Sequence, residues 1–419
     1  MKIKGIRWWI IGLICIATII NYIDRTALAI MWPDIQADLG LTKDDYAWII
    51  NIFMVTYALG KLISGRVYDK VGTKIGFALS IFFWSLAAML HAFAKGMTSL
   101  GIFRGLLGVA EAGPWPGVVK SNAEWFPINE RAVAQGIFNS GAAVGSIVAA
   151  PTIAELASGF GWKATFVIIG VLGFLWLIPW LIINKNKAKD HPWITDEELN
   201  HIVSGQEDKK IVEEETMSIS EILRHKENYG VIFSQFFLEP IWWLFVFWLP
   251  IYLFEQYGFN VKEIGYYAWI PYVGAAFGSL AGGIVVQRLI PSLGVDKARK
   301  RVVLIGNSII FISIVVTILW ADNPEKFVSI VFVTLFGFQF SMSNLQIIAS
   351  DLLGGKSVGT LAGLAGGLGA ISVIIVNFLV PLVTEISYTP VFVILAVLSP
   401  LSFFALITLC KDIKPLKLK

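Results

Sequence analysis

The sequence predicts an all-α membrane protein with twelve transmembrane helices in two six-helix, pseudo-symmetric halves. Three observations lead to this prediction: hydrophobic residues make up 56% of the 419 positions, charged residues make up only 15%, and apolar runs of spanning length recur along the chain. An average soluble domain carries about 25% charged residues, so this chain has too little polar surface to cover a soluble fold. The same composition excludes a disordered chain.

The apolar runs give the spans. A helix needs about 20 residues to cross roughly 30 Å of hydrocarbon, and a spanning segment must satisfy its own backbone hydrogen-bonding groups, which favours helices. Twelve runs meet this length, at about 8–31, 46–66, 75–94, 98–119, 132–157, 163–184, 229–254, 264–288, 302–320, 326–349, 358–383 and 389–410. The first run also has the basic start and the Ala27-Leu28-Ala29 triplet of a signal peptide. Asp24 and Arg25 inside it suit a retained helix better than a cleaved one.

The distribution of Lys and Arg predicts that both ends of the chain are cytoplasmic. With the N-terminus inside, the outer loops hold five basic residues, namely Lys43, Lys95, Lys163, Lys262 and Lys326. Arg25, Lys61 and Arg104 fall inside spans, which leaves 25 of the 33 basic residues in cytoplasmic segments. This asymmetry follows the positive-inside rule for an even number of spans.

The longest polar stretch, at 185–228, divides the spans six and six. We therefore expect an N-terminal bundle at 1–184, a cytoplasmic central loop at 185–228 and a C-terminal bundle at 229–419. Within the loop, Thr195-x-x-Glu198 and Ser218-x-x-Glu221 have the pattern of capping boxes that begin short helices. These helices either lie along the membrane surface or belong to a solvated connector.

The two halves also resemble each other. Span two ends in the motif Gly65-x-x-x-Asp69-x-x-Gly72-x-Lys74, and span eight ends at the matching place in a degenerate copy at 283–288. Two six-helix repeats indicate alternating access, in which a site at the repeat interface opens to one side of the membrane and then to the other.

The motif at 65–74, placed between spans two and three of twelve, resembles the loop signature of the major facilitator superfamily. That resemblance implies that the four motif residues take part in the conformational change. The stretches at 21–25, 104–112 and 124–131 are similar to the anion:cation symporter family, which imports sugar acids and other organic anions. Within this family, the tryptophan- and proline-rich run at 240–250 resembles the hexuronate transporters.

Six charged side chains fall inside the predicted spans. They are Asp24, Arg25, Lys61, Arg104, Glu111 and Glu239, three of each sign. Each would cost about 2.5–3.5 kcal/mol if it stood unpaired at the bilayer centre, so we expect them to pair inside the bundles or around a watery cavity. At about 1.5 Å per residue, Asp24 and Arg104 both lie roughly 10 Å below the outer surface, which predicts that they are neighbours.

Two of these charges suit proton transfer. Burial favours the protonated form of a carboxylic acid and a nearby arginine favours the ionised form, so alternating access lets such a group load and release a proton on opposite sides. Arginine stays charged and presents a fork that matches a carboxylate. The resemblance implies two groups of site residues: proton-coupling Asp24 and Glu111, with Arg104 beside them, and substrate-contacting Tyr22, Arg25 and Tyr57. The alternative is that these residues form structural ion pairs that lock helix packing.

The remaining candidates are interpreted from their surroundings. Lys61 lies one turn after Tyr57, and it either snorkels to the cytoplasm or makes a second contact with the anion. Glu239 precedes Pro240, which should kink span seven, so Glu239 marks either a gate or the end of the helix. Side chains expected to line the substrate path are Asn139, Trp242, Gln339 and Asn344. Most tryptophans in such a chain serve instead as interface belts or packing.

Together these features predict a secondary transporter of the bacterial inner membrane that imports a hexuronate-like sugar acid by proton symport. Another organic anion (an aldonate or a glucarate-like acid), sodium as the driving ion, and a sensor that binds a sugar acid without transport stay open. No enzyme activity, cofactor or nucleic-acid partner is expected, because nucleotide-binding motifs and basic patches are missing from the sequence. No metal site is expected, since the two cysteines lie in apolar runs and the four histidines are dispersed. The expected partners are the organic anion, protons and the lipid bilayer, with the chain acting as a monomer.

Overall fold

The computed structural model describes residues 2–127, 130–185, 187–207, 218–353, 357–385, 387–414 and 416. The chain divides into two compact units, unit 1 at Met1–Val212 with Asn260–Tyr266 and unit 2 at Glu213–Phe259 with Tyr267–Lys419. Each unit is a bundle of helices, and an isolated β-bridge joins Ile3 to Ile194 in unit 1.

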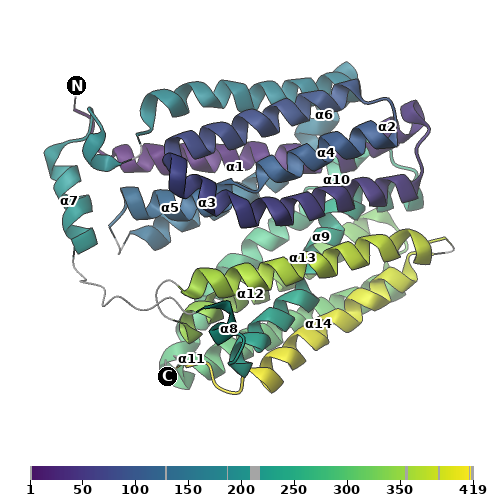
Figure 1. Ribbon diagram of the computed structural model, residues 1–419. Coiled ribbons are helices and arrows are strands. Elements are labelled where there is room, and N and C mark those ends of the chain that lie inside the picture. The colour runs from purple at the N-terminus through teal and green to yellow at the C-terminus, as the bar shows by residue number, and fades with distance from the viewer. Residues whose placement is uncertain are drawn as a thin grey trace. The chain divides into compact units, whose positions relative to one another are not determined.

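Unit 1 is built around four helices that pack side by side. α1 (Ile6–Ile30) packs along α6 (Arg131–Ile183), while α3 (Lys43–Leu90) packs on both α4 (Met97–Glu111) and α6 (Figure 1). Shorter elements complete the unit: α2 (Trp32–Leu39), η1 (His91–Phe93), α5 (Pro114–Trp125), η2 (Ala188–Asp190), α7 (Asp196–Glu207) and most of α10 (Val261–Tyr267).

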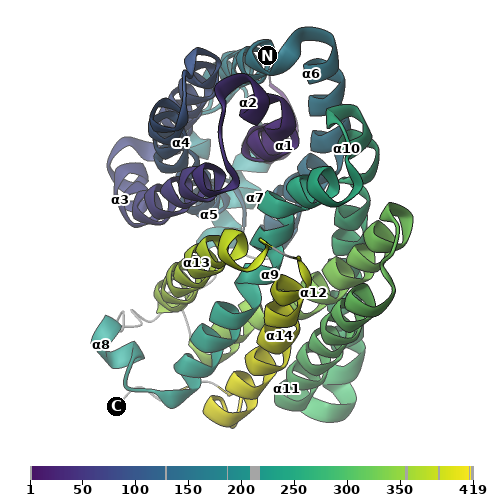
Figure 2. The same ribbon diagram turned by 90° about the vertical axis from the view of Figure 1, so that its right-hand side faces the viewer.

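Unit 2 is built around α9 (Lys226–Tyr257), which follows the single turn of α8 (Ile219–Ile222). α9 packs on helices from the end of the chain, namely α12 (Pro324–Leu352), α13 (Ser357–Val383) and α14 (Thr389–Leu409). α11 (Ile270–Trp320) folds against α12 and also contacts α14 (Figure 2).

All twelve predicted spans lie on helices of the structure. Among the described residues, eight helical stretches are long and apolar enough to cross a membrane, and two of them, Val133–Ile183 and Val261–Trp320, have 51 and 60 residues. At about 1.5 Å per residue, each of these two is more than twice as long as the roughly 30 Å hydrocarbon core, so each holds two spans. The helices are those of a multi-pass membrane protein.

Single glycines replace three of the predicted loops. We expected loops between spans two and three, five and six, and eight and nine, but helix continues on both sides of Gly72, Gly161 and Gly294. These glycines have φ of 81°, 78° and 74° and ψ of 167°, 163° and 167°. Residues with a Cβ rarely adopt a positive φ of this kind. One glycine is therefore enough to interrupt the helix between two spans.

Span four, predicted as one helix at 98–119, is interrupted. α4 ends at Glu111 and α5 begins at Pro114. Pro114 and Pro116 have no backbone N–H to donate to the preceding turn, which removes hydrogen bonds that a continuous helix needs. The interruption leaves Glu111 as the last residue of α4.

Both capping boxes predicted for the central loop mark the starts of helices. At α8, Ser218 and Glu221 form the two reciprocal bonds of a full box. At α7, Thr195 accepts a hydrogen bond from the backbone N–H of Glu198 at 3.2 Å, which is half of a box. The Glu198 carboxylate does not complete the box, because it accepts hydrogen bonds from the start of α1.

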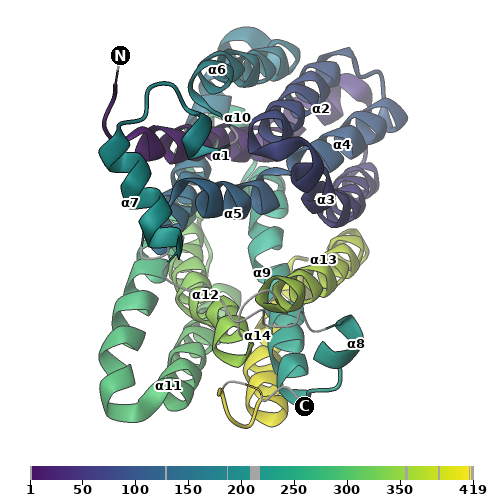
Figure 3. The same ribbon diagram turned by 60° about the vertical axis from the view of Figure 1, so that its left-hand side comes forward.

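The Glu198 carboxylate caps the first transmembrane helix. It accepts hydrogen bonds from the backbone N–H groups of Gly5, Ile6 and Arg7 at 2.8, 3.1 and 3.3 Å, and from the Arg7 guanidinium at 2.8 Å. The first N–H groups of a helix have no partner inside the helix and favour a nearby negative charge. α7 consequently lies against the start of α1, as Figures 1 and 3 show.

Arg7 extends this network to the start of α6. Its Nε donates to Glu130 at 2.8 Å, and Nε2 of His201 lies 2.9 Å from the same carboxylate. Partial burial opposes ionisation of Glu130, but the hydrogen bonds with Arg7 and His201 outweigh it and lower the pKa of Glu130 below its usual 4.5. Because the folded pKa is lowered, the stability that Glu130 contributes is present above pH 4.5 and is lost as the pH falls through the folded value.

Glu198→Gln should loosen the first turn of α1, because a neutral amide replaces the charged acceptor of these hydrogen bonds. We expect the backbone amides of Gly5 to Arg7 to exchange with deuterium roughly 30-fold faster, which corresponds to about 2 kcal/mol of lost protection. The control is Glu197→Gln, since Glu197 lies on the same helix with a side chain that is 79% exposed. Equal exchange in the two variants would contradict the capping role.

Candidate functional site

A fully buried ion pair joins α1 to α4. Nε and Nη2 of Arg25 donate to the same oxygen, Oε2 of Glu111, at 3.0 and 2.9 Å, and the two side chains are 1% and 0% exposed. Nη2 of Arg25 also donates to Oδ1 of Asn21 at 3.1 Å. The sequence suggested separate tasks for Arg25 and Glu111, whereas the structure brings them into direct contact. Asn21 was not predicted as a site residue, although its position one turn before Arg25 on the same helix could have indicated the contact.

Three aromatic rings surround the Arg25 guanidinium. Its Cζ lies 4.9 Å from the ring centroid of Tyr57, 5.2 Å from that of Tyr22 and 5.8 Å from that of Phe53. Each such cation–π contact stabilises the guanidinium by about 0.5–2 kcal/mol. The two tyrosines are among the predicted site residues. Phe53 was missed, although it lies one turn before Tyr57 on α3 and stacks on it at 5.6 Å.

Asp24 and Arg104 are neighbours, as their equal depth predicted, and they act on each other electrostatically, but no hydrogen bond joins the two side chains. Nη2 of Arg104 donates instead to the backbone carbonyl of Arg25 at 2.6 Å. Both oxygens of Asp24, and Nε and Nη1 of Arg104, are buried without a hydrogen-bond partner in the described part of the chain. Residue spacing fixes depth along one helix but not how that helix is rotated relative to its neighbour, so it could not distinguish a contact with Asp24 from one with the adjacent backbone.

Lys61 shares the Tyr57 ring with Arg25. The Nζ atom of Lys61 lies 4.5 Å from the ring centroid of Tyr57 and 6.0 Å from that of Trp115 on α5. Trp115 in turn meets Phe138 of α6 edge-on, with ring centroids 4.8 Å apart. Two cations from α1 and α3 therefore lie against one aromatic ring.

Asn139 lies at the end of a row of side-chain amides. Nδ2 of Asn122 on α5 donates to Oε1 of Gln135 at 3.1 Å, and Nε2 of Gln135 donates to Oδ1 of Asn139 at 3.3 Å. Asn139 itself is exposed. A lone amide in an apolar span needs a partner, and here Gln135, which was not predicted, provides it.

The motif between spans two and three connects α3 to its neighbours. Gly72 is the positive-φ break of α3, and the Lys74 carbonyl accepts a hydrogen bond from the indole of Trp180 on α6 at 2.9 Å. Beside the motif, Lys120 on α5 donates to the carbonyl of Tyr68 at 2.8 Å. The surroundings of Gly65 and of the Asp69 side chain lie outside the described part of the structure.

In unit 2, the predicted aromatic and acidic residues of α9 lie against other helices. Trp242 stacks on Phe338 of α12, with ring centroids 5.6 Å apart. Glu239 accepts a hydrogen bond from the indole of Trp243 at 3.1 Å and packs against Gly369 of α13. α9 is helical from Lys226 to Tyr257, so Glu239 lies well inside the helix and the helix-end alternative is excluded.

Asn344, which was expected to line a substrate path, belongs to a buried hydrogen-bond network in the structure. Its Oδ1 accepts from Nη1 of Arg299 at 3.0 Å, and its Nδ2 donates to the Phe340 carbonyl at 3.1 Å. Arg299 also pairs with Asp351 at 3.0 Å. The amide is 1% exposed, and both its oxygen and its nitrogen are engaged within the protein. Gln339, predicted together with Asn344, is half-buried on the same helix.

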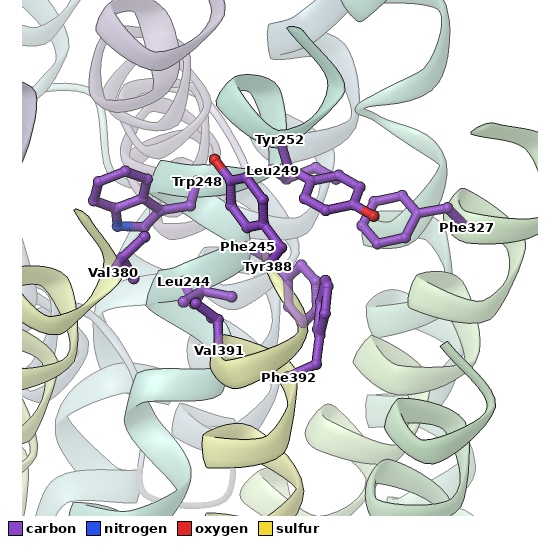
Figure 4. A pocket seen from close by; sticks show the side chains of 10 residues that line it. All are labelled: Leu244, Phe245, Trp248, Leu249, Tyr252, Phe327, Val380, Tyr388, Val391 and Phe392. Atoms are coloured by element: carbon purple, nitrogen blue, oxygen red, sulfur yellow. The ribbon is translucent and has the colours of Figure 1, made fainter. Parts of the chain in front are cut away.

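The cavity in Figure 4 is too small for a ligand. It lies within unit 2, is lined by side chains that include Trp248, Tyr252, Phe327 and Tyr388, and has a volume of about 10 Å³. A single water molecule needs about that much space, so this cluster is aromatic packing. Among the described residues, no group of three or more His, Cys, Asp or Glu could hold a metal ion.

Comparison with known proteins shows the family. Residues 14–376 match the family described as Major Facilitator Superfamily. The chain is 32% identical over 415 residues to the hexuronate transporter of Escherichia coli (strain K12), covering 98% of this chain and 95% of that protein. It is 36% identical over 308 residues to the galacturonate transporter of Dickeya chrysanthemi, covering 73% of this chain and 89% of that protein.

A solved structure supports the same fold. The D-xylose-proton symporter matches with a TM-score of 0.78 at 10% identity, over 97% of this chain and 98% of that chain. A likeness at this identity shows the fold alone. The sequence motif, the family match and the fold agree: the chain belongs to the Major Facilitator Superfamily.

Proposed function

We propose that this protein imports hexuronate-like sugar acids together with protons across the bacterial inner membrane. The observation that carries the proposal is the buried pair between Arg25 and Glu111, and the two sugar-acid transporters similar to this chain support the class of substrate. The chain works as a monomer with both termini in the cytoplasm. Bundles at 1–184 and 229–419, joined by the cytoplasmic loop 185–228, alternate access to the site, with the 65–74 motif and Glu239 taking part in the change.

The carboxylate of the substrate binds Arg25. A guanidinium is the side chain whose fork matches a carboxylate, and Tyr22 and Tyr57 flank it. In the described structure the Nε and Nη2 donors are taken by Glu111. An incoming carboxylate must therefore compete with Glu111 for the same donors. Asn139, Trp242 and Gln339 supply further contacts to the hydroxyl groups and the sugar face.

Protonation of Glu111 decides this competition. A neutral carboxylic acid holds a guanidinium far less strongly than a carboxylate does, so a proton on Glu111 releases Arg25 for the substrate. When the proton leaves, Glu111 recovers Arg25 and the substrate is displaced. Proton and sugar acid thus act on one guanidinium, which is the coupling that symport requires.

Asp24 is proposed as the second proton carrier. Within the described residues, both of its oxygens are buried without a hydrogen-bond partner, and Glu111, Arg104 and Arg25 act on it electrostatically. An ionised carboxylate without hydrogen bonds at this depth would cost several kcal/mol, so the geometry suits the protonated acid. Nε and Nη1 of Arg104, which have no hydrogen-bond partner in the described part of the chain, can meet Asp24 once that proton is released.

Glu111→Gln should uncouple transport from the proton gradient, because the amide keeps the size of the acid but cannot release a proton. In proteoliposomes we expect concentrative, pH-driven uptake of labelled glucuronate to fall to background while counterflow exchange continues. Counterflow is the internal control for folding and binding. Uphill accumulation by this variant under an imposed gradient would remove Glu111 from the coupling mechanism.

Arg25→Lys should weaken sugar-acid binding at least tenfold, because a point charge replaces a fork that makes two parallel hydrogen bonds. The lysine can still pair with Glu111, so the variant should fold and melt close to the wild type. Binding is measured by tryptophan fluorescence titration in detergent. Wild-type affinity in a folded variant would place the substrate carboxylate elsewhere.

Asp24→Asn should make substrate affinity independent of pH on the outer side while leaving the protein folded, because the amide fills the same buried space without titrating. The measurement is the apparent Kd of glucuronate at a series of pH values for both proteins. A variant that keeps the wild-type pH profile would show that Asp24 does not carry a coupled proton.

A further inference from the structure

His91 is a fully buried titratable residue that the proposed mechanism does not use. It begins η1 and is 0% exposed. Its ring stacks on that of Phe166 of α6, with centroids 4.7 Å apart, and lies 6.1 Å from the ring of Phe103 on α4. Phe103 directly precedes Arg104, and Arg104 acts on His91 electrostatically. His91 therefore belongs to the surroundings of Arg104.

A backbone carbonyl fixes the protonation of the His91 ring. Its Nδ1 lies 2.7 Å from the carbonyl oxygen of Ala87. A carbonyl oxygen has no hydrogen to donate, so Nδ1 carries the proton of this hydrogen bond. A second proton, on Nε2, would put a cation in an apolar pocket beside the permanently charged Arg104, which is unfavourable. The ring is therefore neutral, and its Nε2 is a hydrogen-bond acceptor.

The buried atoms without partners around Arg104 complement each other. In the part of the chain that the structure describes, Nε2 of His91 is an acceptor without a hydrogen-bond partner, and Nε and Nη1 of Arg104 are donors without one. Buried polar groups of native proteins are nearly all hydrogen-bonded, and where the protein supplies no partner an ordered water does. A water that accepts from Arg104 and donates to His91 satisfies both side chains.

We propose that His91 holds Arg104 through an ordered water while Asp24 is protonated, and thereby sets the pH at which Asp24 exchanges its proton. The inference rests on the function proposed above, since it takes Asp24 to be a coupling acid. It makes His91 a positioning residue, which acts through Arg104 and not on the sugar acid.

The guanidinium of Arg104 then has two alternative acceptors for the same donors. An ionised Asp24 attracts Nε and Nη1, whereas a protonated Asp24 leaves them to the water on His91. Nη2 is held separately by the Arg25 carbonyl at 2.6 Å, so the change of partner concerns the other two nitrogens. Because His91 accepts only in the state with a protonated Asp24, it stabilises that state.

The other titratable groups nearby are unchanged by a substitution at His91. The groups that act electrostatically on Arg104, on Asp24 or on both are Arg25, Tyr46 and Glu111. The rings that pack on His91, Phe103 and Phe166, carry no charge. A shift in pH dependence caused by a substitution at His91 therefore reports on its link to Arg104.

The experiment removes the acceptor but keeps the ring. In His91→Phe an aromatic ring still packs on Phe166, but no atom accepts from the water. We expect the pH midpoint of glucuronate affinity to move about one unit toward acid, because Arg104 then turns to Asp24 and favours its ionised form. His91→Gln retains an acceptor and should keep the wild-type midpoint. Thermal melting checks the folding of both variants.

Thr165→Val is the matched control. Thr165 is buried and precedes Phe166, and its hydroxyl donates to the carbonyl of Gly161 on its own helix at 2.9 Å. The variant thus removes a buried polar group close to His91 without removing an acceptor for Arg104. It should leave the midpoint unchanged.

NMR of the protein labelled with 15N at histidine gives a second readout, in which the signal lost in His91→Gln identifies His91. Between about pH 5 and 8 we expect its Nδ1 to stay protonated and its Nε2 to stay unprotonated.

The inference is overturned if His91→Phe keeps the wild-type midpoint, or if His91→Gln or Thr165→Val shifts it as His91→Phe does. It is also overturned if Nε2 of His91 carries a proton in the wild type. A wild type whose affinity for glucuronate does not change with pH would overturn the proposed role of Asp24 as well, whereas the other outcomes leave that role standing.

Discussion

The pairing of Arg25 with Glu111 inside unit 1 is the interaction on which the rest of the site depends. Removing one partner would leave an uncompensated buried charge at a cost of about 3–5 kcal/mol, so each ionised group requires the other. Neighbouring groups are arranged around the pair: Asn21 and three aromatic rings hold the guanidinium, and Arg104 is fixed to the backbone carbonyl of Arg25. Anything that alters the charge of one partner therefore disturbs α1, α3 and α4 together.

Between α9, α11 and α14 of unit 2, polar groups follow the same constraint without using charge. Ser234 on α9 and Ser402 on α14 each donate to the other's backbone carbonyl, and Asn307 on α11 makes the same reciprocal exchange with Ser399 on α14. In an apolar surrounding an unsatisfied hydroxyl or amide is costly, so each of these polar groups both needs and supplies a partner. The contrast in chemistry is clear: unit 1 concentrates buried charge near its centre, whereas α9, α11 and α14 are joined by neutral hydrogen bonds.

Hydropathy was enough to predict the helices, because spanning length and apolar composition are properties of a segment by itself. The missed features depend on groups brought together by folding. Depth along a helix placed Asp24 and Arg104 at one level, and the two groups act on each other electrostatically, but it could not show that Arg104 donates its hydrogen bond to the Arg25 carbonyl. Asn344 looked like a free amide in an apolar run, and only the fold brings Arg299 to it. Glu198 fitted a local capping box, yet its carboxylate serves residues near the other end of unit 1's sequence.

That last arrangement has a consequence for synthesis of the chain. The N–H groups of Gly5, Ile6 and Arg7 obtain their acceptor from a residue more than 190 positions later. While the ribosome is producing the residues up to α7, the first turn of α1 does not yet have the carboxylate that accepts from those groups. The start of the first helix is therefore completed after the whole N-terminal bundle has been made, when α7 emerges and supplies its carboxylate. The first turn of α1, near the beginning of the sequence, therefore reaches its final hydrogen bonding only after residues close to position 200 have been made.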